Sequence, residues 1–289
     1  MKSKLEKTLN IILFGIVQTQ LIKTNLEVWV NLGLTVRAVV CDQGSNNRAA
    51  FKHLGATAAD PVLKLNSLVP IVGIFDPPHL IKSFRNALLT SDIKSPDGTV
   101  SWKVIRALYK LEIDSVTRMC PRLTDNHENP GHFDQMKVKL ASQVFSQSVV
   151  ARLKTVYELN KFLECVKQNT PATWAFFEKV DKLFDCLNSK CLFDGNQFRS
   201  ALQHHDKSVP FKFLTDMIDY IGKIKLSNGK KVFSFDGMVQ TIRGVLFVSK
   251  ALSDENIPYL MTSRLNQDAL ENTFSLVRSA NGNNSTPSV

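Results

Sequence analysis

Two short apolar segments, each leading into a polar turn and then a helix, constrain the fold of this chain more than any other feature. Residues 34–41 read Leu-Thr-Val-Arg-Ala-Val-Val-Cys and stop at Asp42, and residues 70–75 stop at Asp76. Apolar, partly β-branched segments of this length, bounded by turn residues, are typical of buried strands. Helices are expected after the two turns, over 46–54 and 80–89. The repeated order of strand, turn and helix predicts an α/β core.

The rest of the chain is predicted to be mainly helical. A helix over 11–31 precedes the first strand and ends at Gly33. Beyond Trp102, prolines separate segments whose apolar residues recur every three to four positions. The dipeptide Asn228-Gly229 predicts a β-hairpin between 224–226 and 232–234. The helices expected in this part span 104–111, 135–148, 148–168, 173–187, 212–225, 235–251 and 267–279, followed by a loop over 280–289.

Composition narrows the class of protein. The chain has 289 residues, of which 44% are apolar, so it is long enough for two cores or one elaborated core. Its formal charge of +10 favours an anionic partner, most often nucleic acid, although a solvated basic surface without a partner is the alternative. The five cysteines show no Cys-x-x-Cys spacing and indicate reduced thiols inside the cell. No apolar run approaches the eighteen residues that a membrane span requires.

Several acidic residues stand where chemistry could occur. Asp268 and Glu271 are three positions apart on an expected helix, so both project from one face. The alternative is a solvated helix face, with Arg264 as an ion-pair partner of Asp268. Asp42 follows a buried strand, where open α/β sheets place reactive groups, but its position alone favours a turn or N-cap aspartate for the next helix. Asp76 has the same two interpretations.

A further polar pair lies on the mainly apolar helix expected over 173–187. Phe184-Asp185 is followed by Asn188, which again places two polar groups three residues apart. By itself this spacing does not decide between a functional site and a surface stripe. Phosphate-loop, nucleophile-elbow and dinucleotide-binding motifs do not occur, because their required spacings are not met.

Four motifs in order carry a resemblance to a known family. They are Val-Val-Cys-Asp-Gln-Gly-Ser-Asn-Asn (39–47), Phe-Asp-Pro-Pro-His-Leu-Ile-Lys (75–82), Phe184-Asp185-x-x-Asn188 and Gln-Asp-Ala-Leu-Glu-Asn (267–272). Together they resemble the P-element transposase family, which includes the THAP-domain transposases. The resemblance implies a partial RNase H-like nuclease core interrupted by a large, mainly α-helical insertion that binds GTP. The implied limits are a core over 1–100, an insertion over 101–262 and a returning part of the core over 263–289.

The resemblance also implies the catalytic residues. Asp42 would be the second acid of a catalytic Asp-Asp-Glu set and Glu271 the last. Both would hold Mg²⁺ for phosphodiester cleavage and strand transfer on DNA. Carboxylates suit this role because Mg²⁺ prefers hard oxygen ligands.

The implied nucleotide contacts are separate from the catalytic acids. Asp185 would accept from the ring N–H and the amine of guanine, which discriminates against adenine. Phe184 and Asn188 would lie beside it, and Asp268 would be a further nucleotide contact. The phosphate contact would be Lys137 or Lys139, and Ser146 and Ser148 are weaker candidates in the same region.

The chain also departs from the family pattern. Asp42 is its first aspartate, so the family's first catalytic acid has no counterpart upstream, and the zinc-binding THAP domain is missing. We therefore expect a partial transposase that does not cleave DNA alone. The alternative is a domesticated, non-catalytic GTP- or DNA-binding protein. The expected partners are DNA, GTP and a possible second copy of the chain in the nucleus, with no membrane.

Overall fold

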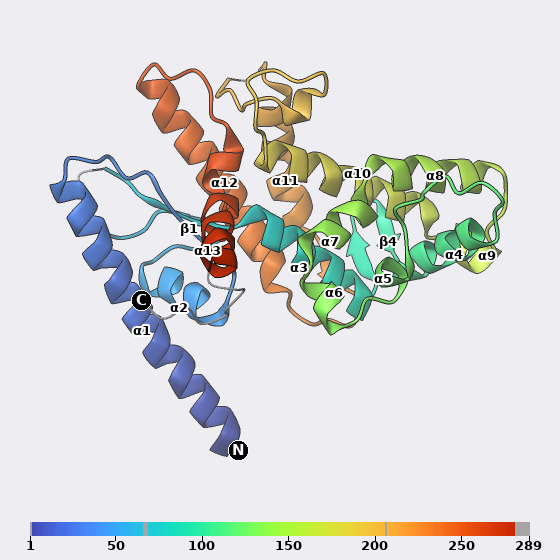
Figure 1. The fold of residues 1–289 in the computed structure, drawn as a ribbon, viewed down its shortest axis with the longest axis horizontal. Helices are drawn as coiled ribbons and strands as arrows, with labels where there is room; N and C mark the ends of the chain where they lie inside the picture. Colours follow the sequence, from blue (N-terminus) through green and yellow to red (C-terminus); the bar gives the residue numbers. More distant parts are fainter. Residues whose placement is uncertain (1, 66–68, 206, 281–289) are drawn as a thin grey trace.

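The computed structural model describes residues 2–65, 69–205 and 207–280, with backbone only for 2–15 and 280 (Figure 1). The strands are β1 Ala38–Cys41, β2 Val72–Phe75, β3 Ile93–Ser95, β4 Gly98–Val100 and β5 Lys225–Leu226. The helices are α1 Lys2–Asn31, α2 Ser45–His53, α3 Pro77–Thr90, α4 Trp102–Ile113, α5 Asp125–Glu128, α6 His132–Met136, α7 Val138–Phe145, α8 Gln147–Glu158, α9 Glu164–Lys167, α10 Thr170–Leu187, α11 Val209–Gly222, α12 Phe233–Asp254 and α13 Asp268–Ala280. Short 3₁₀ turns lie at Gln197–Arg199 and Thr262–Leu265.

The two strands expected from the sequence form a parallel pair. Their register runs from Ala38 opposite Val72 to Cys41 opposite Phe75. All four residues of β2 are buried, as its continuous apolar sequence predicts. Because the strands are parallel, the turns that begin at Asp42 and Asp76 lie at the same end of the sheet.

Helix α12 covers the edge of β2 that β1 leaves open. The hydroxyl of Thr241 accepts from the backbone N–H of Phe75 at 3.1 Å and donates to its carbonyl at 2.9 Å. Gln240 donates to the carbonyl of Gly73 at 3.0 Å. Gly244 allows the close approach, since a Cβ there would lie 2.8 Å from Cγ1 of Ile74. Side chains of a helix thus satisfy backbone groups that would otherwise belong to an exposed edge.

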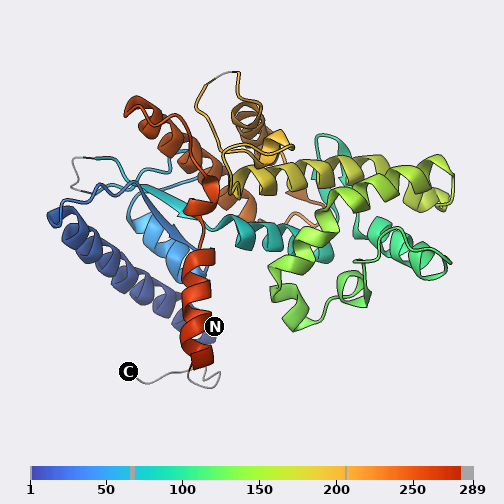
Figure 2. The same cartoon turned by 45° about the horizontal axis from the view of Figure 1, so that its top comes forward.

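The helical region extends from the sheet along α3 and α10 (Figure 2). Helix α3 begins at Pro77 with Asp76 as its N-cap, and it buries Leu80, Ile81 and Phe84. Helix α10 packs against α3, α7 and α8, and one continuous apolar core joins the sheet to these helices. Two of the expected helices are each divided, 135–148 into α6 and α7, and 148–168 into α8 and α9.

The hairpin predicted at Asn228-Gly229 is wrong. A turn does form, with Gly229 at φ +72, but residues 232–234 enter α12 instead of a second hairpin strand. Strand β5 pairs antiparallel with β3, which places Ile93 opposite Leu226, in a small sheet ordered β4-β3-β5. The sequence analysis missed β3 and β4, whose three-residue lengths carry almost no alternation signal.

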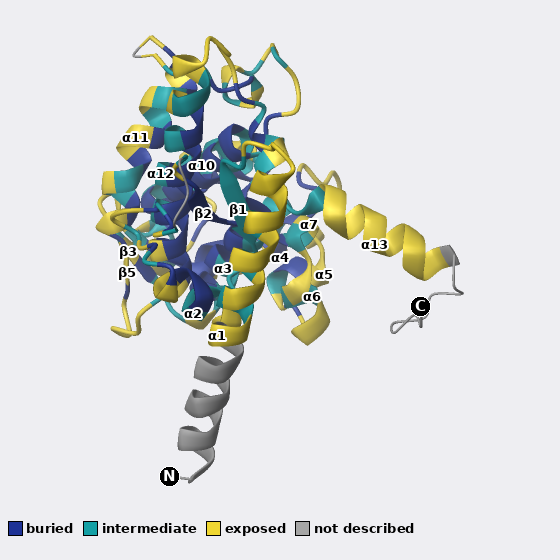
Figure 3. Cartoon of the chain, turned by 90° about the vertical axis from the view of Figure 1, so that its left-hand side faces the viewer, coloured by how far each residue is buried: buried dark blue, intermediate teal, exposed yellow. Residues whose placement is uncertain are grey.

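Helix α13 and the part of α1 from residue 16 are mostly exposed along their lengths (Figure 3). Gly33 ends α1 at φ +81, as expected. Every residue of α13 from Ala269 to Ser279 is exposed. The loop expected over 280–289 lies outside the described residues except for Ala280, which ends α13. Among the described helices, none is both long enough and apolar enough to cross a membrane.

Candidate functional site

The end of the parallel sheet brings the turns of Asp42 and Asp76 together. The backbone N–H of Asp76 donates to the carbonyl of Cys41 at 2.8 Å, which joins the two strand ends. Asp42 is exposed, and its Oδ1 accepts from Gly44 N at 2.9 Å and from Asn47 Nδ2 at 2.7 Å. In the described part of the chain, Oδ2 of Asp42 makes no hydrogen bond. One oxygen therefore fixes the turn while the other faces solvent.

Asp76 is buried, with 1% of its surface exposed, and its carboxylate is fully used. Oδ2 accepts from the backbone N–H of His79 at 3.1 Å and contacts Nδ1 of the same residue at 2.6 Å. Oδ1 accepts from the backbone N–H of Gln267 at 2.8 Å. Asp76 thus caps α3, one of the two roles that its position suggested, and also anchors the chain immediately before α13.

His79 extends this network to Glu271. Its Nε2 lies 3.7 Å from Oε1 of Glu271, whose side chain is 58% exposed. The hydrogen bond to Asp76 raises the pKa of His79, and the charge of Glu271 acts in the same direction. Asp76 and His79 therefore connect the sheet to the first turn of α13.

Lys82 lies among the carboxylates at this end of the sheet. Burial lowers its pKa, while the charges of Asp42, Glu271 and Asp76 raise it. Asp42 and Glu271 are 271 − 42 = 229 residues apart in the sequence, yet both act on the same ammonium group. The fold therefore brings Asp42 and Glu271 to the same end of the sheet, where His79 of α3 lies 3.7 Å from Glu271 and lines one cleft with Asp42 and Lys82.

The donor chemistry of this cluster fits a hard divalent cation. Asp42 and Glu271 are carboxylates with oxygens open to solvent, the ligand type that Mg²⁺ prefers. Asp76 is committed to its hydrogen bonds. Within residues 2–65, 69–205 and 207–280, no group of three or more His, Cys, Asp or Glu side chains is arranged to hold a metal ion.

A second polar cluster surrounds Asp185 near the end of α10. Its Oδ2 accepts from Arg199 Nε at 3.0 Å and from Asn196 Nδ2 at 3.1 Å. Burial raises the pKa of Asp185, and the bond to Arg199 opposes this effect. One turn earlier, burial and the charge of Asp185 raise the pKa of Asp181 to about 6.

Asn266 connects the end of α10 to the start of α13. Its Nδ2 donates to Oδ1 of Asn188 at 3.1 Å and to Oδ2 of Asp268 at 3.2 Å. Its Oδ1 accepts from the backbone N–H of Asp268 at 3.2 Å. The structure therefore brings Asn188 and Asp268 together. Sequence reasoning missed Asn266, although an asparagine just before a helix is a recognisable signal.

The remaining predicted contacts lie elsewhere. Phe184 is half-buried against the apolar core. Lys137 pairs with Asp134 at 2.9 Å, and Lys139 is exposed on α7. Ser146 and Ser148 share a hydrogen bond of 3.0 Å and line a different cavity, of about 260 Å³. Among the described residues, no hydrogen bond or ion pair joins these lysines and serines to Asp185, Asn188 or Asp268.

Two family models match parts of the chain. Residues 78–201 match the family model described as a TNP-like GTP-binding insertion domain, and residues 263–289 match the TNP-like RNase H C-terminal domain. The fold class predicted from the sequence, an RNase H-like core with a mainly helical insertion, is confirmed.

Individual relatives are similar to most of the chain. The chain is 27% identical to the Drosophila melanogaster "Transposable element P transposase" over 257 residues, covering 86% of this chain and 33% of the relative. It is 24% identical to the human "DNA transposase THAP9", covering 94% of this chain and 31% of the relative. The solved "Drosophila P element transposase strand transfer complex" superposes with a TM-score of 0.78 at 25% identity, covering 89% of this chain and 58% of that one. The chain is therefore similar to P-element-type transposases over most of its length, and it spans about a third of the length of the curated relatives it matches.

Proposed function

We propose that this chain provides part of the catalytic core and the nucleotide-binding region of a P-element-type DNA transposase. The observation that carries the proposal is the geometry at one end of the sheet, where Asp42, His79 and Lys82 line one cleft and Nε2 of His79 lies 3.7 Å from Oε1 of Glu271. The two acids come from the two segments that would together form the nuclease core, residues 1–100 and residues 263–289. The intervening residues 101–262 would form the insertion.

The proposed reaction is cleavage and transfer of DNA phosphodiester bonds. Asp42 and Glu271 would hold Mg²⁺, which would activate the attacking oxygen and stabilise the leaving one. Asp76 and His79 orient the first turn of α13, so that Glu271 faces the sheet. A third acid, from outside this chain, would complete the set.

The proposed nucleotide is GTP. Asp185 would face the guanine, because its Oδ1 makes no hydrogen bond among the described residues and can accept from an incoming N–H group. Asn188 and Asp268, joined through Asn266, lie within reach of the same ligand. Phe184 would pack beside it, and Lys137 or Lys139 would approach its phosphates. DNA as substrate, assembly with a second copy and a nuclear location belong to the same proposal.

A nucleotide titration tests the GTP assignment. Calorimetry on the purified chain is expected to show tighter binding of GTP than of ATP, and Asp185→Ala is expected to remove that preference. The matched control is Asp216→Ala on α11, an exposed aspartate that makes no hydrogen bond or ion pair in the described structure. Equal and weak binding of both nucleotides to the unmodified chain would contradict the assignment.

A cleavage assay tests the catalytic half. The chain with Mg²⁺ is expected to leave DNA uncut, because two carboxylates alone hold a catalytic metal pair poorly. Robust cleavage that Glu271→Ala abolishes would show that this chain already contains a complete set of metal ligands.

A further inference from the structure

A cleft beside the two acids has no assigned role. Its volume is about 510 Å³, and three elements form its walls. The turn from Asp42 to Gly44, with Arg48 of α2, forms one wall. Helix α3 forms the second with His79, Lys82, Ser83, Asn86 and Thr90. The segment 230–234 at the start of α12 forms the third.

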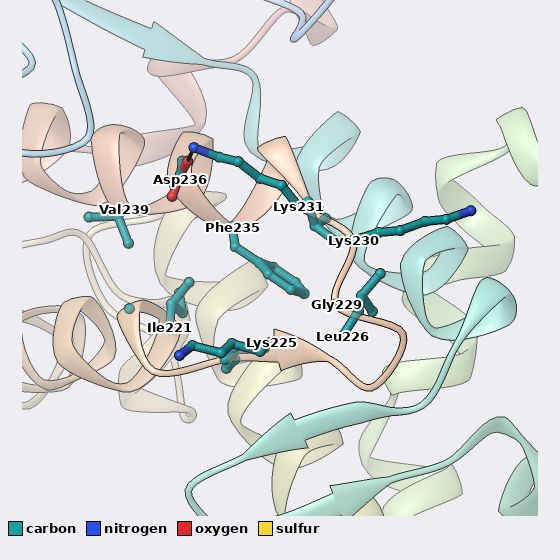
Figure 4. Close-up of a pocket in the computed structure, with 12 residues that line it drawn as sticks. Ile221, Lys225, Leu226, Gly229, Lys230, Lys231, Phe235, Asp236 and Val239 are labelled. Atoms are coloured by element: carbon teal, nitrogen blue, oxygen red, sulfur yellow. Dashed lines mark ion pairs between the residues drawn. The ribbon is translucent and has the colours of Figure 1, made fainter.

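The charges that line the cleft are mostly positive. Asp42 is the single acid, against Arg48, Lys82, Lys230 and Lys231. Lys231 is neutralised by Asp236 at 2.8 Å. Figure 4 shows Lys231 reaching Asp236 while Lys230 extends in the opposite direction. In the described structure, Lys82 and Lys230 form no ion pair or hydrogen bond through Nζ, so their positive charge is available to a ligand.

Ser234 supplies an independent sign that a ligand belongs here. It lines the cleft, is 4% exposed, and its buried hydroxyl has no hydrogen-bond partner among the described residues. A buried hydroxyl without a hydrogen-bond partner destabilises the folded chain. Two other polar side chains of the cleft already have hydrogen-bond partners, since Ser83 donates to the carbonyl of His79 and Asn86 donates to that of Gln135. An oxygen of a bound ligand would satisfy the Ser234 hydroxyl.

The cleft walls are fixed to each other before any ligand arrives. Gln43 Nε2 donates to the carbonyl of Phe233 at 2.7 Å. The guanidinium of Arg48 lies 4.1 Å from the centroid of the Phe233 ring. The absence of a Cβ at Gly237 leaves room for the Gln43 amide, which would have to shift if a side chain were added there. The segment 230–234 is thus docked on the turn that carries Asp42.

We propose that this cleft binds the sugar–phosphate backbone of the DNA strand that reaches Asp42 and Glu271. Lys82 contacts the phosphate nearest the acids, and Lys230 and Ser234 contact one farther along the strand. The proposal rests on the transposase function proposed above, because it takes its ligand from that reaction. Lysine and hydroxyl contacts to phosphate position a strand without reading its sequence. The cleft therefore contributes affinity but no sequence preference.

Fluorescence anisotropy with a labelled DNA duplex, titrated at several salt concentrations, tests this assignment. Lys230→Ala is expected to weaken binding by about threefold to tenfold and to reduce the slope of log K against log salt by about 1. The control is Lys212→Ala on α11, an exposed lysine that makes no ion pair through Nζ in the described structure. Equal losses in the two variants would overturn the proposal, because they would indicate a diffuse charge effect.

Two further measurements separate the possible ligands. Ser234→Ala is expected to weaken DNA binding about twofold to fivefold while the melting temperature stays equal or rises, because the substitution removes an unsatisfied buried hydroxyl. A fall in the melting temperature without a loss of DNA affinity would give Ser234 a purely structural role. GTP affinity is expected to be unchanged in Lys230→Ala. If GTP binding falls and DNA binding does not, the cleft holds nucleotide phosphates, and the DNA assignment fails while GTP binding itself stands.

Discussion

Helix α10 bears the proposed nucleotide contact and helix α13 the proposed catalytic glutamate, and the two helices differ in how they are attached to the rest of the molecule. Helix α10, which bears Asp185, buries nine residues, and six of these belong to the continuous apolar core. Helix α13, which bears Glu271, is exposed along its length from Ala269 (Figure 3). The proposed nucleotide cluster is therefore built into a packed region, whereas Glu271, the proposed catalytic glutamate, depends on a few polar contacts at the base of its helix.

Those few contacts also join the two regions. Asn266 bonds to Asn188 at the end of α10, and the next residue, Gln267, bonds to Asp76 at the end of the sheet. A change around Asn188 therefore reaches Glu271 through five residues of chain. The difference in packing predicts that the stability of α13 depends on the polar contacts of Asn266 and Gln267, whereas the stability of α10 depends on its buried apolar side chains.

The largest expected effect contrasts two phenylalanines. Phe177 of α10 is fully buried, with its ring centroid 4.9 Å from that of Phe145. Phe177→Ala is expected to lower the free energy of unfolding by about 3–5 kcal/mol, because it leaves a cavity in the core. Phe274→Ala on α13 is expected to change it by less than about 0.5 kcal/mol, since that side chain is 54% exposed. Urea denaturation measures both, and similar losses would refute the contrast.

A smaller effect is expected from the anchor of α13. Asp76→Ala removes the cap of α3 and the acceptor for Gln267, so unfolding should become easier by about 2–3 kcal/mol. Hydrogen exchange should show faster exchange in α13, with α10 unchanged. Asp42→Ala is the control, because Asp42 accepts only from its own turn. Unaltered exchange in α13 of the Asp76 variant would mean that other contacts hold this helix.

The sequence predicted the elements that depend on local pattern. Both parallel strands, the helices that follow them and the start of α13 are where apolar periodicity and turn residues placed them. The role of Asp76 could not be decided from sequence, because its third partner, Gln267, is 191 residues away. Strand β5 was paired with the wrong segment for the same reason, since β3 lies more than 120 residues upstream.

The candidate site was predictable only in part. The spacing of Asp268 and Glu271 predicted that both lie on one face of a helix. It could not predict their different neighbours, which are His79 for Glu271 and Asn266 for Asp268. The position of Asn266 before a helix is a local signal, but its contact with Asn188 at the end of α10 joins residues 78 positions apart and has no local signal. The positive cleft beside Asp42 is formed by three segments that are distant in the sequence, so no local run of charged residues predicts it.

The smallest expected effect concerns the acidic side chains of the two helices, Asp181 in α10 and Glu271 in α13. Burial raises the pKa of Asp181 in α10 from 3.8 to about 6, whereas the side chain of Glu271 in α13 is 58% exposed. Between about pH 4 and pH 6 the unfolded chain loses this proton before the folded chain does. Stability therefore falls as the pH rises through that window, and the cost is fully present above it. Because Asp181 is partly exposed, the cost is about 1 kcal/mol rather than the full value of the shift.

Asp181→Asn is therefore expected to raise the melting temperature at pH 7 and to leave it unchanged at pH 3.5, where the carboxyl is mostly protonated in both states. Asp216→Asn, an exposed control on α11, should follow the unmodified chain at both pH values. A stabilisation of equal size at the two pH values would trace the effect to the amide's packing instead of the buried charge. The packed region would then hold its acids at no electrostatic cost, and the contrast with α13 would rest on apolar burial alone.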